Sequence, residues 1–390
     1  MRGRNSNEPS MFFAINVEDR VAAGHPLRPI RRMVDEELAR LAPAFAAAYS
    51  TAGRPSVPPE RLLKAMLLQC LYSIRSERQL VDRVNADLLF RWFAGMDPAE
   101  PCFDAVAFTH DRPRLEEFEI IGLFFDGVVR RAIDAGLTGD EHFSVDGTLI
   151  DSHAAMKSVK PIGGDGSDDE EGDPGGFETF KPRGPDVDFR GQKRTNATHH
   201  STTDPEARLY RKGVGQAGRL CHMAHAISEN RHGLVMAVAC GEASGTAEAA
   251  AALAMVDGLC RRGVRVDTLG ADKGYDSGPL MLDLEGRGVM PHVAMNLSGD
   301  TRDVVGGRGR RAKADRARIE ARRRMHARLD GEGYRLSNRC RKKLEEGFAW
   351  LKTAAGLART RLVGRWKLAG QVRLAAAAYN LVRMRKLLAA

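Results

Sequence analysis

The sequence predicts a two-domain α/β protein, with an all-helical N-terminal domain over residues 1–135 and a mixed α/β sheet domain over residues 136–390. Three observations predict this division. Apolar residues recur at helical spacing before residue 135, short apolar runs of strand length follow it, and basic residues gather near the C-terminus. A chain of 390 residues is long enough to form both domains.

The N-terminal domain is predicted from helix starts and from apolar spacing. Pro58-Pro59-Glu60 is typical of a helix start, and apolar side chains then recur at helical spacing over residues 62–74. Ser76-Glu77-Arg78-Gln79 has the form of a capping box, which predicts a second helix. A further helix is expected over residues 118–133, before Gly136. Such a bundle carries no chemistry of its own, so packing, dimerisation and reading of DNA ends all stay open.

The second domain is predicted from apolar runs that end at turns or acids. The expected strands cover residues 142–145, 220–228, 234–240, 264–271 and 289–295. Asp146 follows the first of these strands and Asp272 follows the fourth. An Ala-rich helix is expected over residues 246–259, and a late helix carries Glu345. This order of strands and helices indicates a mixed sheet.

Residues 154–218 interrupt this pattern. They are polar and rich in Gly, Pro, Thr and charged residues, which predicts an irregular insertion. Within the insertion, residues 165–173 hold six acids in nine positions. Packed like charges repel and need solvent, so this run favours a solvated loop over a metal site.

Basic charge is concentrated at the C-terminal end. The whole chain has a formal net charge of +9, but residues 301–390 hold 25 Lys and Arg against 7 Asp and Glu, a net of +18. This pattern predicts nucleic acid as the partner, with a solvated basic helix surface as the alternative. The expected DNA clamp is the basic segment 301–330 with a C-terminal helix over about 365–388. The arginines singled out in that segment are Arg308, Arg310, Arg311, Arg322, Arg323 and Arg324.

Several classes of protein are disfavoured by the same composition. No run approaches the roughly 20 apolar residues of a membrane span, and the first residues lack the apolar core of a secretory signal. The six cysteines are scattered and include no C-x-x-C pair, so they are expected to be reduced thiols. We therefore expect a cytoplasmic protein with no membrane partner, associated with the nucleoid only through DNA.

Three acids are candidates for phosphoryl-transfer chemistry: Asp146, Asp272 and Glu345. A carboxylate at the end of a strand is held on rigid backbone at the rim of a sheet, where ligands usually bind. Two Mg²⁺ ions about 3.5–4 Å apart take such oxygen ligands in phosphoryl transfer. Taken singly, each aspartate fits a turn at least as well, because Asp-Gly between apolar runs is a hairpin signal.

The late helix sharpens the assignment of the third acid. At 100° per residue, Arg341, Glu345 and Lys352 fall within about 40° on one face, beside an apolar stripe. Glu346 points about 100° away from this row. A plain ion pair between Arg341 and Glu345, one helical turn apart, is the alternative.

Five segments together carry a resemblance to a known family. They are residues 145–151 (VDGTLID), 195–212 (TNATHHSTTDPEARLYRK), 271–277 (ADKGYDS), 341–352 (RKKLEEGFAWLK) and 376–383 (AAAYNLVR). In this order they resemble the DDE transposases of bacterial insertion sequences, in the insertion-sequence-four/five superfamily. The spacing of Arg341, Glu345 and Lys352 is similar to the R-E-K part of the Y-R-E-K signature of that superfamily. The signature tyrosine position holds Asn338, and Tyr334 lies four residues earlier.

The resemblance implies an RNase H-like core in which Asp146, Asp272 and Glu345 form a metal-binding catalytic triad. It implies two Mg²⁺ ions, for which Mn²⁺ is expected to substitute, and it implies that Arg341 and Lys352 hold DNA phosphates. The implied activity is binding of the terminal inverted repeats of an element, cleavage of the DNA and transfer of the 3′-OH to target DNA. A homodimer in the complex with double-stranded DNA is expected. The N-terminal helical region resembles the N-terminal domain of the family up to about Arg83.

Other classes of function compete with this one. A catalytically inactive, transposase-derived DNA-binding protein would keep the basic tail and lose a carboxylate, whereas all three are present. A standalone nuclease of the same fold would need the carboxylates but no paired-end assembly. A phosphatase of the haloacid dehalogenase type needs a nucleophilic aspartate two residues before Asp146, where Ser144 stands. A zinc module fits no tetrahedral ligand spacing. Its candidate ligands would be His199, His200, Cys221, His222 and His225.

Overall fold

The chain forms two compact units, Met1–Phe118 and Glu119–Ala390. The structure, a computed structural model, describes residues 16–50, 52–53, 55–139, 141–162, 195–211, 217–245, 247–296 and 310–389, with the backbone alone for 310–314. Predicted features that fall elsewhere, such as the acidic run at 165–173 and Arg308, lie outside the described residues.

The first unit is helical throughout its described elements. These are α1 (Val17–Arg20), α2 (Leu27–Arg40), α3 (Ala42–Ala48), α4 (Pro59–Leu71), α5 (Glu77–Ala86), α6 (Leu88–Ala94) and α7 (Val106–Glu117). The start of α4 at Pro59 is confirmed, and its apolar face, including Leu63 and Leu67, is fully buried. The start of α5 is confirmed as well, because the Ser76 hydroxyl accepts a hydrogen bond from the Gln79 amide at 3.2 Å.

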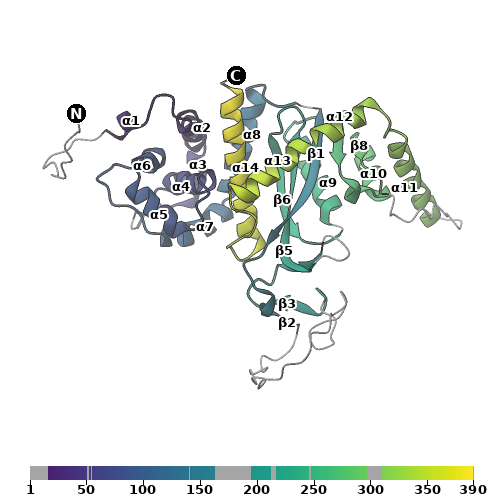
Figure 1. The fold of residues 1–390 in the computed structure, drawn as a ribbon, viewed down its shortest axis with the longest axis horizontal. Helices are drawn as coiled ribbons and strands as arrows, with labels where there is room; N and C mark the ends of the chain where they lie inside the picture. The colour runs from purple at the N-terminus through teal and green to yellow at the C-terminus, as the bar shows by residue number, and fades with distance from the viewer. Residues whose placement is uncertain are drawn as a thin grey trace, which may run out of the picture. The chain divides into compact units, whose positions relative to one another are not determined.

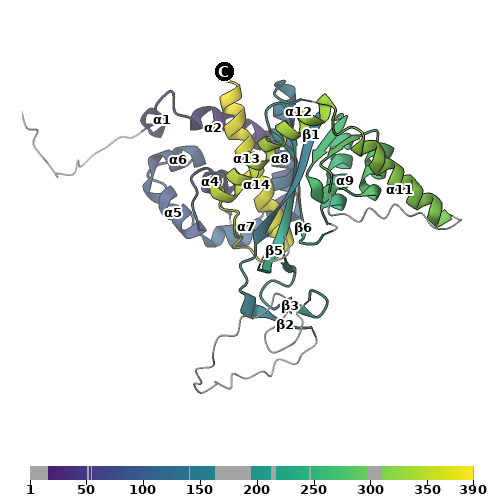
Figure 2. The ribbon, with the colours of Figure 1, turned by 45° about the vertical axis from the view of Figure 1, so that its right-hand side comes forward.

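A mixed sheet is the core of the second unit. Its strands lie in the order β4 (Arg208–Tyr210), β5 (Arg219–Glu229), β1 (His142–Asp151), β7 (Thr268–Ala271) and β8 (Met290–Val293), with β6 (Val235–Glu242) also paired to β5. The β1–β5 and β5–β6 pairs are antiparallel, whereas β1–β7 and β7–β8 are parallel. A small separate sheet pairs β2 (Val159–Pro161) with β3 (His199–Ser201), which lies below the main sheet in Figures 1 and 2.

Two predictions about this sheet were wrong in detail. The first strand does not end before Asp146, because its pairing with β5 continues in register to the pair Asp151 and Cys221. Asp146 therefore lies in the middle of a strand, and Asp146-Gly147 is not a hairpin turn. The insertion 154–218 is not wholly irregular either, since β2, β3 and β4 lie within it.

Helices cover both faces of the main sheet. They are α8 (Ile120–Asp134), α9 (Ala247–Arg261), α10 (Gly278–Gly286), α11 (Arg310–His326), α12 (Glu332–Cys340), α13 (Lys342–Thr353) and α14 (Arg365–Leu387). Successive residues of a strand point to opposite faces. Gly147 faces Glu248 of α9, whereas Asp146 faces Arg341 at the start of α13. Thus α9 and α13 lie on opposite sides of β1, while α8 lies along α14 (Figure 1).

The predicted C-terminal helix is present as α14, and two side chains fix it against the strands. The Asn380 amide bonds both backbone groups of Val235 on β6, accepting from its nitrogen at 2.9 Å and donating to its oxygen at 2.7 Å. At the other end of α14, the Glu206 carboxylate accepts hydrogen bonds from the backbone and the guanidinium of Arg365 at 2.7 and 2.8 Å. Asn380 and Glu206 both belong to segments that carry the family resemblance, and in the structure both hold α14 in place.

Candidate active site

Asp146 and Glu345 are brought together by one arginine. Arg341 lies at the N-terminal end of α13, and its guanidinium nitrogens are 4.0 Å from Asp146 Oδ2 and 3.4 Å from Glu345 Oε1. The Asp146 side chain is 18% exposed and the Glu345 side chain 53% exposed, so the pair is open to solvent on the α13 side. The predicted Arg341–Glu345 ion pair therefore exists, but it also includes Asp146 from the sheet.

Asp272 lies directly after β7, the strand parallel to β1. The β1–β7 register pairs Ser144 with Gly270. This is the last pair between the two strands, so Asp146 and Asp272 each lie two residues beyond it. The Asp272 carboxylate caps the short helix Lys273–Tyr275 (η3) by accepting a hydrogen bond from the Gly274 amide at 2.8 Å. The position of Asp272 is therefore fixed by β7, which precedes it, and by its hydrogen bond to the start of η3, which follows it.

Tyr275, three residues after Asp272, is a buried side chain whose ionisation is affected by both aspartates. Tyr275 is 1% exposed, and its hydroxyl has no hydrogen-bond partner among the described residues. Burial raises the pKa of Tyr275, and the charges of Glu248, Asp146 and Asp272 raise it further. The phenol therefore lies within electrostatic reach of all three carboxylates.

Helix α13 carries Glu345 with the orientation that its sequence predicts. Leu344, Phe348 and Leu351 are buried, which leaves Glu345 at the edge of the packed face. Glu346 turns away from this row and lies 3.8 Å from Arg383 of α14. The different neighbours of the two adjacent glutamates make them a matched pair for experiment.

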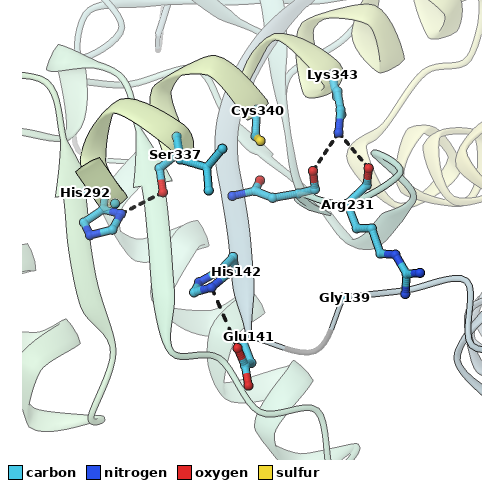
Figure 3. A pocket seen from close by; sticks show the side chains of 11 residues that line it. Gly139, Glu141, His142, Arg231, His292, Ser337, Cys340 and Lys343 are labelled. Carbon is cyan, nitrogen blue, oxygen red and sulfur yellow. Dashed lines mark hydrogen bonds and ion pairs between the residues drawn. The ribbon is translucent and has the colours of Figure 1, made fainter. Parts of the chain in front are cut away.

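A separate pocket lies beside the start of α13, and the hydrogen bonds around it support that end of the helix. It has a volume of about 410 Å³, and its lining includes His142 at the start of β1 but not Asp146 (Figure 3). On one side of it, Lys343 donates hydrogen bonds to the carbonyls of Asn230 and Arg231 at 2.8 and 2.7 Å. On another, His292 of β8 and Ser337 of α12 are hydrogen bonded at 2.7 Å. These bonds hold α12 and α13 against the sheet, and they therefore fix the position of Glu345 relative to the strands.

Helix α11 holds part of the predicted DNA-binding arginines. Arg310 and Arg311 lie in its first turn, and Arg323 is exposed. Arg322 and Arg324 bind within the protein: Arg322 forms two 2.8 Å hydrogen bonds with the buried Asp276, and Arg324 pairs with Glu285 at 2.5 Å. These two contacts hold α11 against α10 and the segment after η3.

The comparisons with known families cover both parts of the chain. Residues 15–114 match the family described as Transposase domain (DUF772), and residues 188–381 match the family described as Transposase DDE domain. The chain belongs to the DDE transposases. The second match contains Asp272 and Glu345 and begins after Asp146. No curated protein and no solved structure matches the sequence.

The fold of this transposase agrees with that membership. A mixed sheet with helices on both faces and a C-terminal helix is consistent with the RNase H-like fold of the family. The insertion-sequence-four/five superfamily stays a prediction. Among the described helices of the transposase, none is long and apolar enough to cross a membrane.

DDE transposases generally depend on divalent metal ions, so the fit of the acids to such ions matters. No three His, Cys, Asp or Glu side chains within the described part of the transposase already form an ion-holding group. The donors nevertheless have the right chemistry, because carboxylate oxygens are the ligands that Mg²⁺ prefers. The unpartnered hydroxyl of Tyr275 beside them marks a buried polar group that a bound ion or its water would satisfy.

Sequence reasoning missed two residues next to these acids, Glu248 and Tyr275, and considered His225 only as a ligand of a zinc module. Glu248 is in the first turn of α9, and its carboxylate faces both Gly147 and Gly274. His225 is paired with Gly147 in the β1–β5 register and is 1% exposed. The available signals were a lone acid opening an Ala-rich helix and a tyrosine inside the segment 271–277.

Proposed function

We propose that this transposase cleaves DNA at the ends of an element and joins the freed 3′-OH to target DNA by metal-dependent phosphoryl transfer. The observation that carries the proposal is the arrangement of three acids. Asp146 lies in β1, Asp272 directly follows the neighbouring parallel strand β7, and α13 brings Glu345 to Asp146 through Arg341.

In this proposal Asp146, Asp272 and Glu345 hold two Mg²⁺ ions, or Mn²⁺ in their place. When bound, such ions activate the attacking oxygen and stabilise the leaving oxygen of a phosphodiester. Arg341 separates the like charges of Asp146 and Glu345 in the free protein and offers its guanidinium to a DNA phosphate in the complex. Lys352, on the same row of α13, contacts the phosphate backbone further along the DNA.

Helix α11 and the C-terminal helix supply the remaining backbone contacts. In the basic segment, the residues proposed for these contacts are those singled out from the sequence, Arg308, Arg310, Arg311, Arg322, Arg323 and Arg324. Arg322 and Arg324 contribute charge to this surface while they also hold α11 in place. Two copies of the chain, one at each element end, complete the proposed complex.

Removal of divalent ions provides the direct test of this function. The native protein is incubated with labelled double-stranded DNA that carries the element ends, in Mg²⁺, in Mn²⁺ and in EDTA. We expect strand cleavage with a free 3′-OH at the ends in either metal, joined product when target DNA is added, and neither in EDTA. Binding of the end DNA without cleavage in any metal would instead indicate a DNA-binding protein.

Binding to DNA should weaken steeply with salt. If α11 and α14 neutralise at least four phosphates, raising the salt from 50 to 200 mM weakens binding by roughly a hundredfold, because condensed counterions are released on binding. Replacing the exposed Arg316 and Arg323 together by Ala should lower the slope of log K against log salt by about 2. Arg265→Ala removes an exposed arginine outside the segment and should leave the slope unchanged. Fluorescence anisotropy titrations measure the salt dependence for the native protein and for the two variants. Equal slopes for all three proteins would contradict the assignment of α11 to DNA binding.

A further inference from the structure

Glu248 lies between the two chain segments that carry the aspartates. A Cβ built on Gly147, the residue after Asp146, would lie 3.1 Å from Glu248 Oε1. A Cβ built on Gly274, two residues after Asp272, would lie 3.2 Å from Glu248 Oε2. One carboxylate thus reaches toward β1 with one oxygen and toward η3 with the other. Both glycines leave the space that this carboxylate needs.

Two buried polar side chains next to Glu248 lack partners among the described residues. The Tyr275 hydroxyl is one, and Glu248 is the carboxylate whose charge raises the pKa of Tyr275 most. The other is His225, both of whose ring nitrogens are unpaired, and whose Nδ1 would be 3.1 Å from the same Gly147 Cβ. Burial lowers the pKa of His225 to about 4, so its ring is neutral. Buried polar groups without partners usually mark an absent ligand or ordered water.

We propose that Glu248 is a fourth carboxylate of the metal site. It reaches a divalent cation from the α9 side of β1, and Asp146 and Asp272 reach the same ion beyond Ser144 and Gly270, where β1 and β7 are no longer paired. This inference rests on the proposed function, because it assumes that Asp146 and Asp272 bind the metal. The Tyr275 hydroxyl then donates a hydrogen bond to a carboxylate oxygen or to water on the ion.

The alternative role for Glu248 is local to its helix. An acid in the first turn of a helix is stabilised by the helix dipole, and α9 has no other acid in that turn. That role needs no particular neighbour, whereas Glu248 faces both glycines of the aspartate segments. An aspartate at the same position would serve the dipole equally well. It would, however, withdraw the carboxylate by one methylene from the two glycines.

The test measures Mn²⁺ binding to the full chain without DNA, by calorimetry and by the loss of the free Mn²⁺ electron paramagnetic resonance signal. We expect Glu248→Gln to weaken Mn²⁺ binding at least tenfold and Glu248→Asp to weaken it by an intermediate factor. Asp257→Asn removes a charge from the same helix, where the carboxylate pairs with Arg287, and should leave the affinity unchanged. Unfolding temperatures without metal confirm that each variant folds. We expect that of Glu248→Gln to stay level or rise, since one of several clustered like charges is removed.

Asp146→Asn and Asp272→Asn separate this inference from the function on which it rests. If both weaken Mn²⁺ binding while Glu248→Gln does not, the fourth ligand is wrong and the proposed triad stands. If neither weakens it, the proposed metal site itself fails. The helix-dipole role predicts a different result. Glu248→Gln would then lower the unfolding temperature, Glu248→Asp would restore it, and both variants would bind Mn²⁺ with native affinity. That result would overturn the proposal.

Discussion

Glu345→Gln is expected to lower the rate of DNA cleavage about a thousandfold, which corresponds to about 4 kcal/mol of transition-state stabilisation. The amide keeps the size of the side chain and removes the negative charge that would hold a cation opposite Asp146. DNA binding should stay within a few-fold of native, because the change leaves Arg341 and Lys352 in place and removes one negative charge. Single-turnover cleavage of labelled end DNA, with binding measured in parallel, checks both expectations.

Glu346→Gln is the matched control for this prediction. It makes the same chemical change at the next residue of α13, whose side chain is 67% exposed and lies near Arg383. Because Glu346 points away from Asp146, its replacement should leave cleavage near the native rate. Should Glu346→Gln abolish cutting while Glu345→Gln retains it, the third acid of the triad would be misassigned.

The secondary structure that could be predicted was the part determined by local periodicity. The face of α13 follows from residue spacing, and burial of Leu344, Phe348 and Leu351 confirms it. Strands β5 and β6 follow from their apolar runs in the same way. Asp146-Gly147 was harder, because its local signal is that of a turn. Pairing of β1 with β5 through Asp151 overrides that signal, and no local pattern announces it.

The surroundings of the acids could not be predicted for a related reason. Gly147 and Gly274 look like turn residues in the sequence, yet in the fold both leave room for the Glu248 carboxylate. Glu248 is more than a hundred residues from Asp146 in the sequence. It lies in an Ala-rich helix whose sequence contains no motif that indicates metal binding. Its relation to the aspartates arises only when α9 packs on β6, β5 and β1 and reaches η3, so it is a property of tertiary structure alone.

Asp204 differs from Glu248, because the sequence drew attention to it and its role is structural. It lies in the segment 195–212, one of the five segments that carry the family resemblance, and it holds parts of the fold together. Asp204 is fully buried, and its Oδ2 accepts hydrogen bonds from the Ser152 hydroxyl at 2.6 Å and from His222 Nε2 at 2.8 Å. His222 is also fully buried, and its other ring nitrogen has no partner among the described residues. This cluster joins β5 to the segments before β4 and after β1, and it is closed to solvent.

Asp204→Ala is therefore expected to destabilise the second unit by about 3 kcal/mol, since it leaves two buried polar groups without their shared acceptor. In a unit of this size that loss lowers the unfolding temperature by roughly 6–12 °C, measurable by scanning calorimetry. Asp204→Asn keeps a carbonyl oxygen that can accept hydrogen bonds from Ser152 and His222, so about 1 kcal/mol should be lost. At a temperature where it is folded, the Asn variant should bind Mn²⁺ and cleave DNA as the native protein does. Loss of cleavage or of Mn²⁺ binding in a folded Asp204→Asn variant would instead assign Asp204 to the active site, and its structural role would be wrong.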